Sequence, residues 1–294
     1  METALNEIQS KGLKRDIIDK FYTKIEIVNL CINLIKTHLS ISYEDDLCIE
    51  PSAGNGSFIE GIKTLSKNFI FYDIKPNHIE VKLQDYLGLN CKEVKNSLDN
   101  NNKTNANVFL VDNKIHIIGN PPFGRQSSLA IKFIKKSCEF GDSVSFILPK
   151  SFKKDSLRKS IPSKFHLKYE ADLPEKSFLV NGVEYDVPCI FQIWEKKDYD
   201  RDIVKKLNPI NFIFVSKEEI PDLSIRRVGV NAGKIDTDIE SKSIQSHYFI
   251  KIINNKSIVE NIEKLNLIEY EFNNTVGPKS ISKQEIIEKY NPLL

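Results

Sequence analysis

Asn120, Pro121, Pro122 and Phe123 form the stretch of this 294-residue chain whose residue types are best suited to chemistry. They follow an apolar run at 115–118 that is typical of a buried strand. Asn120 carries an amide oxygen, and Pro121, which has no N–H, still has a carbonyl oxygen. Two such acceptors could hold the two hydrogens of an exocyclic amine, such as adenine N6, and localise its lone pair for attack on a methyl group. Phe123 offers a face on which a base can stack.

The same four residues also fit a purely structural interpretation, a stiff turn after a buried strand. Two prolines fix the backbone twice and remove two donors, and Pro121 disfavours the helical region for Asn120. Asn120 would then be a turn residue and Phe123 a core residue. In open α/β sheets, however, ligands bind at the carboxyl ends of strands, which is where this corner is expected.

A second candidate site follows the short apolar strand predicted at 47–49. It is a loop of small residues that begins at Glu50 and contains Gly54 and Gly56, which permit a tight turn and close approach of the backbone to a ligand. The loop has no third glycine, so a nucleoside cofactor is favoured over a dinucleotide, whose pyrophosphate must be cradled. Glu50 would receive an ammonium group or tolerate a cationic ligand. A structural turn is the alternative.

Asp73 ends a second apolar strand, predicted at 69–72. It lies about 20 positions after Gly54, the separation at which nucleotide-binding α/β folds place the acid that binds ribose hydroxyls. Asp85 comes only about a dozen positions later, which is too short for a crossover helix and another full strand. We therefore expect an abbreviated connection here.

Asn120-Pro121-Pro122-Phe123 resembles the catalytic motif of Rossmann-like, S-adenosylmethionine-dependent N6-adenine methyltransferases. The similarity covers about residues 20 to 195 and implies S-adenosylmethionine as the cofactor. The order of the motifs, with cofactor motifs first, then the catalytic motif and a recognition region last, resembles the gamma arrangement of these enzymes. Enzymes that methylate protein glutamine amides typically carry Tyr at the position of Phe123, so that substrate is less favoured.

The resemblance also implies roles for residues outside the catalytic motif. Thr23, with the two aromatic residues before it, is similar to the family's lip over the methionine end, although Thr23 and Glu26 also fit a capping box. Asp85 would accept from the adenine amine of the cofactor, and Tyr86 would flank its ring. The cofactor-binding set is Thr23, Glu50, Pro51, Ala53, Gly54, Gly56, Asp73, Asp85, Tyr86 and Asn120.

Candidate substrate contacts come from three further places. Lys150 begins a basic cluster after the strand predicted at 143–148 and could contact phosphates, although a solvated helix face is equally consistent. Phe178 precedes the predicted tight turn at 181–182; the resemblance implies an aromatic residue of this hairpin against a flipped base, but Phe178 also fits a core position. Arg226 and Arg227 lie in a basic, glycine-containing stretch at 224–233, which a second one at 277–283 resembles.

The remaining elements should place these residues in an α/β domain. We expect helices that begin near residues 23, 58 and 127, and a closing pair of strands at 169–173 and 188–195. These patterns predict a Rossmann-like, mostly parallel seven-stranded sheet whose last hairpin is antiparallel. Residues 1–199 would form the catalytic domain, and residues 200–294 a small α+β domain that recognises nucleic acid. The polar, low-complexity segment 95–107 is predicted to be a flexible insertion, with a short strand at 108–111.

Composition narrows the class of protein. A net charge of +2 argues against binding to nucleic acid through bulk charge alone, so any basic surface must be local. Five dispersed Cys residues without a Cys-x-x-Cys pair indicate reduced thiols, a cytosolic compartment and no zinc site. No signal peptide and no apolar run of about 18 residues is seen, so a soluble protein without a membrane partner is expected.

These observations together predict a methyltransferase that modifies adenine N6 in DNA. Two alternatives stay open. The same catalytic motif serves enzymes that methylate RNA, and an inactive chain that binds S-adenosylmethionine could act as a partner subunit.

Overall fold

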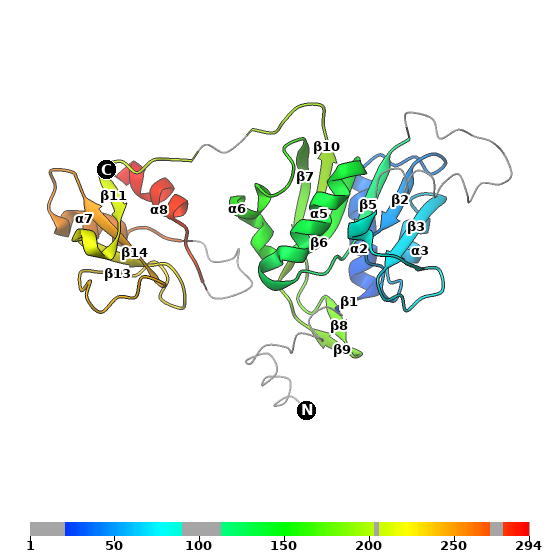
Figure 1. Ribbon diagram of the computed structural model, residues 1–294, viewed down its shortest axis with the longest axis horizontal. Coiled ribbons are helices and arrows are strands. Elements are labelled where there is room, and N and C mark those ends of the chain that lie inside the picture. The colour runs from blue at the N-terminus through cyan, green and yellow to red at the C-terminus, as the bar shows by residue number, and fades with distance from the viewer. Residues whose placement is uncertain (1–20, 90–112, 203–205, 271–278, 294) are drawn as a thin grey trace. The chain divides into compact units, whose positions relative to one another are not determined.

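The computed structural model describes residues 21–89, 113–202, 206–270 and 279–293 (Figure 1). The chain divides into two compact units, residues 1–202 and 203–294. The predicted insertion at 95–107 and the predicted strand at 108–111 lie outside the described residues.

The first unit is built on a seven-stranded sheet with the order β4-β3-β2-β5-β6-β10-β7. The strands from β4 to β6 are parallel, and β10 is antiparallel to both β6 and β7, which confirms the predicted fold class. The strands are β2 (Leu47–Glu50), β3 (Asn68–Asp73), β4 (Lys82–Leu83), β5 (Ile115–Gly119), β6 (Ser143–Pro149), β7 (Phe165–Asp172) and β10 (Cys189–Lys196).

Helices cover both faces of this sheet, so its central strands are apolar on both sides (Figure 1). On one face α5 (Ser128–Phe140) packs in a core with Ile115 and Ile117. On the other face α2 (Ile25–His38) and α3 (Ile59–Lys63) pack in a second core with Ile118. The single-turn helix α6 (Asp155–Arg158) follows β6. No full helix lies between β3 and β4, in agreement with the predicted abbreviated connection.

The capping box predicted at Thr23 and Glu26 is wrong. Helix α2 begins at Ile25, Lys24 is its N-cap residue, and no side chain caps it. Thr23 belongs instead to a short strand, β1 (Tyr22–Thr23), which pairs antiparallel with β8 (Phe178–Val180). The strand β9 (Val183–Tyr185) completes this three-stranded sheet. Asn181 and Gly182 join β8 to β9 with φ angles of 51° and 78°, which confirms the predicted tight turn.

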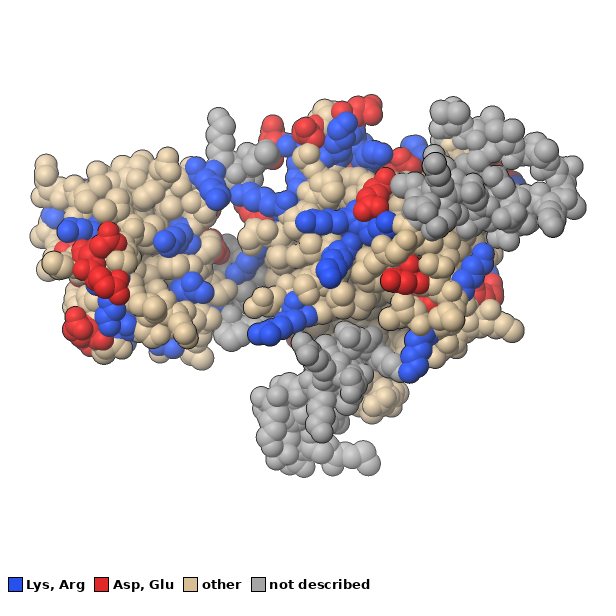
Figure 2. Space-filling model, in the orientation of Figure 1, with Lys and Arg blue, Asp and Glu red and all other residues tan. Residues whose placement is uncertain are grey.

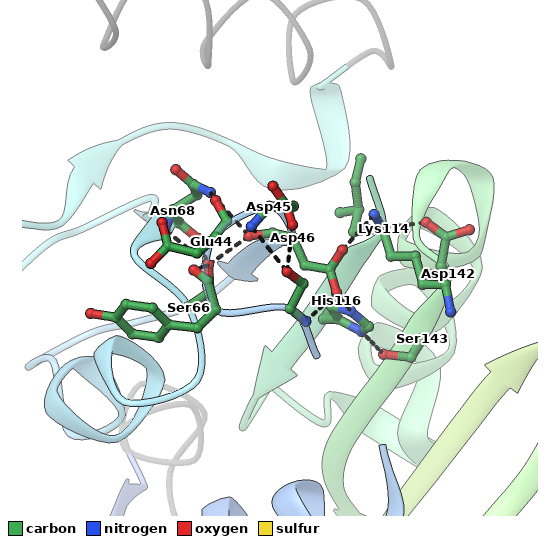
Figure 3. Close-up of polar contacts among 12 residues, drawn as sticks. Glu44, Asp45, Asp46, Ser66, Asn68, Lys114, His116, Asp142 and Ser143 are labelled. Carbon is green, nitrogen blue, oxygen red and sulfur yellow. Dashed lines mark hydrogen bonds and ion pairs between the residues drawn. The ribbon is translucent and has the colours of Figure 1, made fainter. Parts of the chain in front are cut away.

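A buried polar cluster ties together the amino ends of β2, β5 and β6 (Figure 3). Asn120 lies at the other end of β5, directly after Gly119. Asp46 Oδ2 lies 3.1 Å from His116 Nε2, and His116 Nδ1 lies 2.7 Å from Ser143 Oγ. Asp46 also accepts from the backbone N–H groups of Lys114 and Ser42. The order of these groups is that of a hydrolase triad, but all three side chains are buried, so the cluster holds strand ends in register.

The second unit is a small α+β domain, as expected. Its antiparallel sheet has the order β11-β14-β12-β13, and the two helices share a core with the sheet. Both helices begin with a capping box, at Ser257 and at Ser282. The elements are β11 (Phe212–Val215), β12 (Leu223–Arg226), β13 (Ile235–Asp236), β14 (His247–Ile252), α7 (Ile258–Asn266) and α8 (Lys283–Tyr290).

Charge is mixed over the face of each unit that Figure 2 shows. Figure 2 shows lysine and arginine side chains spread over the visible face with acidic side chains among them, as the near-neutral net charge requires. Within the described residues, no helix combines the length and apolar composition that crossing a membrane would need.

Candidate active site

A cavity of about 350 Å³ lies at the carboxyl ends of β2, β3 and β5. All four residues of the predicted catalytic motif line it. Of the ten residues predicted to bind the cofactor, nine line it, and Gly56, which has a φ of +83°, does not. The nine are Thr23, Glu50, Pro51, Ala53, Gly54, Asp73, Asp85, Tyr86 and Asn120. Residues about 100 positions apart in the sequence therefore meet in one pocket.

The carboxylate of Asp73 is held in place by the backbone. Its Oδ2 accepts from Gly54 N–H at 2.8 Å, and its Oδ1 accepts from Lys75 N–H at 2.7 Å. Gly54 has a φ of +51°, which a glycine adopts without strain, so the β2–α3 loop can turn towards Asp73. Each carboxylate oxygen keeps a further lone pair for a hydroxyl donor in the cavity.

Glu50 is a buried acid at the end of β2, with only 2% of its surface exposed. Among the described residues, nothing hydrogen-bonds to its Oε2 atom. Burial, and then the nearby charge of Asp73, raise the pKa of Glu50 to about 8. Gly119 leaves room for this side chain, because a Cβ at that position would lie 3.1 Å from Glu50 Cγ.

The side-chain amide of Asn120 forms hydrogen bonds through its NH₂ group, whereas its oxygen forms none among the described residues. Its Nδ2 donates to the carbonyl of Phe21 at 3.3 Å and to Thr23 Oγ1 at 3.2 Å. Its Oδ1 is buried and has no hydrogen-bond partner among the described residues. Buried acceptors of this kind are rare, since leaving one unsatisfied costs about 1–3 kcal/mol, and each is a candidate for ligand binding.

Phe123 is half-buried and packs against both cores of the first unit. Its carbonyl accepts from the N–H groups of Leu129 and Ala130, which ties the motif to the first turn of α5. Between them, Gln126 and Ser127 have left-handed φ angles of 52° and 61°. Such strained non-glycine residues cluster at functional sites. This strain could not be predicted from the sequence, because neither residue type is restricted to such a conformation.

Asp85 and Tyr86 line the far side of the cavity, but they differ in environment. Asp85 is exposed and caps the turn that follows it, with Oδ1 accepting from Leu87 N–H at 3.0 Å. Tyr86 is buried, its hydroxyl lies 2.9 Å from Ser137 Oγ, and its ring stacks on Phe133. Burial raises the pKa of Tyr86 well above its ordinary value. Only the ring of Tyr86 is therefore left for a ligand.

The lining residues that were not predicted from the sequence include two polar ones, Lys75 and Asn77. Both lie in the loop after β3, where they share the carboxyl edge with Asp73. Asn77 Nδ2 donates to the hydroxyl of Tyr22, which also lines the cavity. Their position just after an acid-terminated strand is a signal that could have found them.

Neither Phe178 nor Lys150, the two predicted substrate contacts in the first unit, lines this cavity. Phe178 is fully buried, with its ring against that of Phe21. Lys150 lies 3.5 Å from Asp172, so its charge is partly balanced. In the second unit, Arg226 Nε donates to the Val228 carbonyl, and the guanidinium of the exposed Arg227 lies 5.4 Å from the centre of the Tyr248 ring.

No protein-family model matches the chain, and no curated protein matches it. Many solved structures resemble it in part, and three of them illustrate the similarity. A proposed RNA methyltransferase from Pyrococcus horikoshii is 15% identical, with a TM-score of 0.43 over 66% of this chain and 98% of that one. A proposed class I S-adenosylmethionine-dependent methyltransferase from Listeria monocytogenes is 14% identical, with a TM-score of 0.41 over 70% of this chain and 69% of that one. The 23S rRNA methyltransferase ErmE is 10% identical, with a TM-score of 0.39 over 61% and 71%. At these values the function has to follow from the cavity itself.

Proposed function

We propose that this protein transfers a methyl group from S-adenosylmethionine to the exocyclic N6 amine of adenine in a nucleic acid, with DNA as the favoured substrate. One observation carries the proposal: the buried Oδ1 of Asn120 lines the cavity without a partner among the described residues. A ligand that donates a hydrogen bond would satisfy this oxygen, and an exocyclic amine is such a ligand.

The wall formed by β2 and β3 fits S-adenosylmethionine. Glu50 offers a buried acceptor for an ammonium group, and Asp73 offers lone pairs to ribose hydroxyls. Gly54 and Ala53 keep the loop between them free of large side chains. When bound, S-adenosylmethionine supplies a methyl group made electrophilic by the positively charged sulfur. The cavity volume of about 350 Å³ lies within the usual range for small-molecule sites.

The Asn120 side of the cavity suits the target amine. Asn120 Oδ1 and the carbonyl of Pro121 would accept its two hydrogens and draw the nitrogen towards a tetrahedral geometry. Phe123 would stack on the base. No strong general base is required at the start, because the amine loses its proton only after it has become cationic. The target base would be flipped from a duplex or taken from a single strand.

The second unit supports a nucleic-acid substrate, since it has its own core and exposes Arg227 and Lys283. DNA is favoured because a separate unit follows the complete catalytic one, as in enzymes that read a site. The Asn120 motif would serve adenine in RNA equally well, so RNA is the main competitor. The second competing function is that of an inactive subunit that binds the cofactor.

Transfer assays test the proposal. The full chain is incubated with methyl-labelled S-adenosylmethionine and DNA, RNA or protein, and the products are digested to nucleosides. We expect N6-methyladenine from DNA. Asn120→Ala should abolish transfer but leave the affinity for S-adenosylhomocysteine largely intact, because Asn120 acts on the target amine. Phe123→Ala should lose about 1–3 kcal/mol of base stacking, and Phe123→Trp should retain more activity.

The possible outcomes separate the alternatives. Labelled adenine in RNA alone would replace DNA as the substrate and keep the amine chemistry. Binding of S-adenosylhomocysteine without transfer to any adenine-containing polymer would favour the inactive subunit. A product methylated elsewhere than on N6 would refute the role of Asn120.

A further inference from the structure

The amide of Asn120 can sit in only one orientation. The carbonyl oxygen of Phe21 is an acceptor and cannot donate, so the group 3.3 Å from it must be the NH₂ end of the amide. A flipped amide would place two oxygen acceptors against each other. The contact with Phe21 therefore determines that Oδ1, rather than Nδ2, is the unpaired atom that lines the cavity.

Thr23 supplies a second anchor for the same NH₂ group. Its hydroxyl lies 3.2 Å from Asn120 Nδ2, and only 6% of the residue is exposed. With one anchor the amide could still rotate about its last side-chain bond, whereas two anchors fix its plane. Both anchors come from β1 and its flank, about 100 positions away from Asn120 in the sequence.

β1 is only two residues long and is held by the β8–β9 hairpin (Figure 1). Thr23 pairs with Phe178, and the N–H of Lys24 donates to the Ser177 carbonyl at 3.1 Å. The ring of Phe21 stacks on Tyr185 and meets Phe178 edge-on. The hairpin thus sets the position of both groups that hold the Asn120 amide.

We propose that Thr23 is a positioning residue for methyl transfer, which acts with the Phe21 carbonyl to aim Asn120 Oδ1 at the target amine. This inference rests on the proposed function. In this role the Thr23 hydroxyl acts on the target amine through Asn120. This differs from the role implied by the sequence, which was to bind the methionine end of the cofactor. Phe178 pairs with Thr23 of β1 and thereby indirectly supports the Asn120 amide.

The two roles of Thr23 predict different defects. A residue that aims Asn120 changes the transition state of transfer, so kcat falls while the affinity for cofactor stays the same. A residue that binds the cofactor changes that affinity, and saturating cofactor restores the rate. Thr23→Val removes the hydroxyl at nearly constant shape, and Thr23→Ser retains it as the matched control.

We expect Thr23→Val to lower kcat by about 10-fold, as for the loss of one buried hydrogen bond. The affinity for S-adenosylhomocysteine, measured by calorimetry, should stay within about twofold, and Thr23→Ser should recover most of the rate. Thr23→Val with an unchanged kcat would overturn the proposal. So would a loss of affinity that fully accounts for the lower rate.

A second measurement needs no turnover. The side-chain NH₂ resonances of Asn120 are identified in an NMR spectrum by their loss in Asn120→Asp. In the wild-type protein their hydrogens should exchange slowly with water, and Thr23→Val should accelerate this exchange, while Thr23→Ser should not. Equal exchange rates in wild-type and Thr23→Val protein would overturn the proposal. Absence of methyl transfer by the wild-type protein would instead overturn the proposed function, so the two failures are distinguishable.

Discussion

Two buried oxygen atoms define the chemistry at the scale of single residues. Glu50 Oε2 and Asn120 Oδ1 both lie in residues that line the cavity, and neither has a partner among the described residues. A buried acceptor without a hydrogen-bond donor costs free energy, and each of these two oxygens would be satisfied by a different donor group of a ligand. An ammonium group suits the acid, and an amine with two hydrogens suits the amide.

Glu50 should give up a proton when an ammonium ligand binds. Its pKa, raised to about 8, leaves it mostly protonated at pH 7, whereas a nearby cation favours the carboxylate. The affinity for S-adenosylhomocysteine should therefore rise with pH up to about 8 and then level off, because Glu50 is then already ionised. Calorimetry at pH 7 in buffers of different ionisation enthalpy measures the expected release of up to one proton.

Matched ligands and variants check this assignment. 5′-Methylthioadenosine has no ammonium group and should bind without releasing the proton. Glu50→Gln should abolish the proton release that accompanies binding of S-adenosylhomocysteine. If the variant released as many protons as the wild-type protein, another group would be responsible. The titratable neighbours that line the same cavity are Tyr22, Asp73, Lys75, Asp85 and Tyr86.

At the scale of elements, the sequence predicted the strands better than the contacts between them. The strands observed at 47–50, 68–73 and 115–119 were predicted at 47–49, 69–72 and 115–118, because a strand buried on both faces is apolar throughout. Thr23 was assigned to a capping box because that pattern is local, but its partner is Asn120, far along the chain. Phe178 was a candidate for base contact, and a three-residue strand carries too little periodicity to show that it faces the core.

Removing the Phe178 ring should loosen the β8–β9 hairpin under β1. Phe178 is fully buried and contacts Phe21, so Phe178→Ala should lower the free energy of unfolding by about 3–5 kcal/mol. Urea denaturation measures this loss. Val183→Ala on the same hairpin is the control, because Val183 is 48% exposed and its loss should cost far less. Similar losses in both variants would contradict the packing described here.

The Asp46 cluster should stabilise the fold more at neutral pH than in acid. Burial alone would raise the pKa of Asp46, but hydrogen bonds from His116 and from the N–H groups of Lys114 and Ser42 lower it below its ordinary value. A lowered pKa in the folded state adds stability above the ordinary value of 3.8, and this stability is lost as the pH falls through the folded value. At pH 7, Asp46→Asn should cost about 2–3 kcal/mol.

Urea denaturation over a pH series tests the direction of this effect. The difference between Asp46→Asn and the wild-type protein should narrow as the pH falls below 3.8, where the unfolded state takes up the proton first, and it should be lost below the folded pKa, where Asp46 is protonated in both states. Asp45→Asn is the control, since Asp45 is exposed and hydrogen-bonds only the Ser42 hydroxyl among the contacts described. A difference that stayed constant with pH would show that the charge of Asp46 contributes no stability.

At the scale of the whole molecule, each unit has its own core. The second unit is the one proposed to recognise the nucleic-acid substrate. The structure joins the two basic stretches that stand out in the sequence. Val228 bridges Ser280, Gly229 N–H donates to the Lys279 carbonyl, and Ile281 N–H donates to the Arg227 carbonyl. No sequence pattern revealed this pairing, because about 50 residues separate the two stretches.

Cations and aromatic rings alternate beside this pairing. The guanidinium of Arg227 lies 5.4 Å from the centre of the Tyr248 ring, and Lys283 Nζ lies 4.7 Å from that of Phe214. The rings hold these two cations in place while both residues stay exposed. Such ordered cations suit phosphate contacts or, for an arginine, the edge of a guanine.

Arg227 and Lys283 should therefore affect nucleic-acid binding in different ways. If Lys283 contacts a phosphate, Lys283→Ala should weaken binding to all sequences alike and reduce the slope of log K against log salt by about 1. If Arg227 reads a base edge, Arg227→Ala should cost about 1–3 kcal/mol and relax preference at one position of the site. Equilibrium binding of the full chain to duplex DNA and to RNA, over a range of salt, measures both quantities.

Lys289→Ala, at an exposed lysine in the last turn of α8, is the control for a general loss of charge. If Lys283→Ala and Arg227→Ala both bound DNA and RNA as the wild-type protein does, nucleic-acid recognition through these two residues would be refuted, and the chemistry proposed at Asn120 would be unaffected.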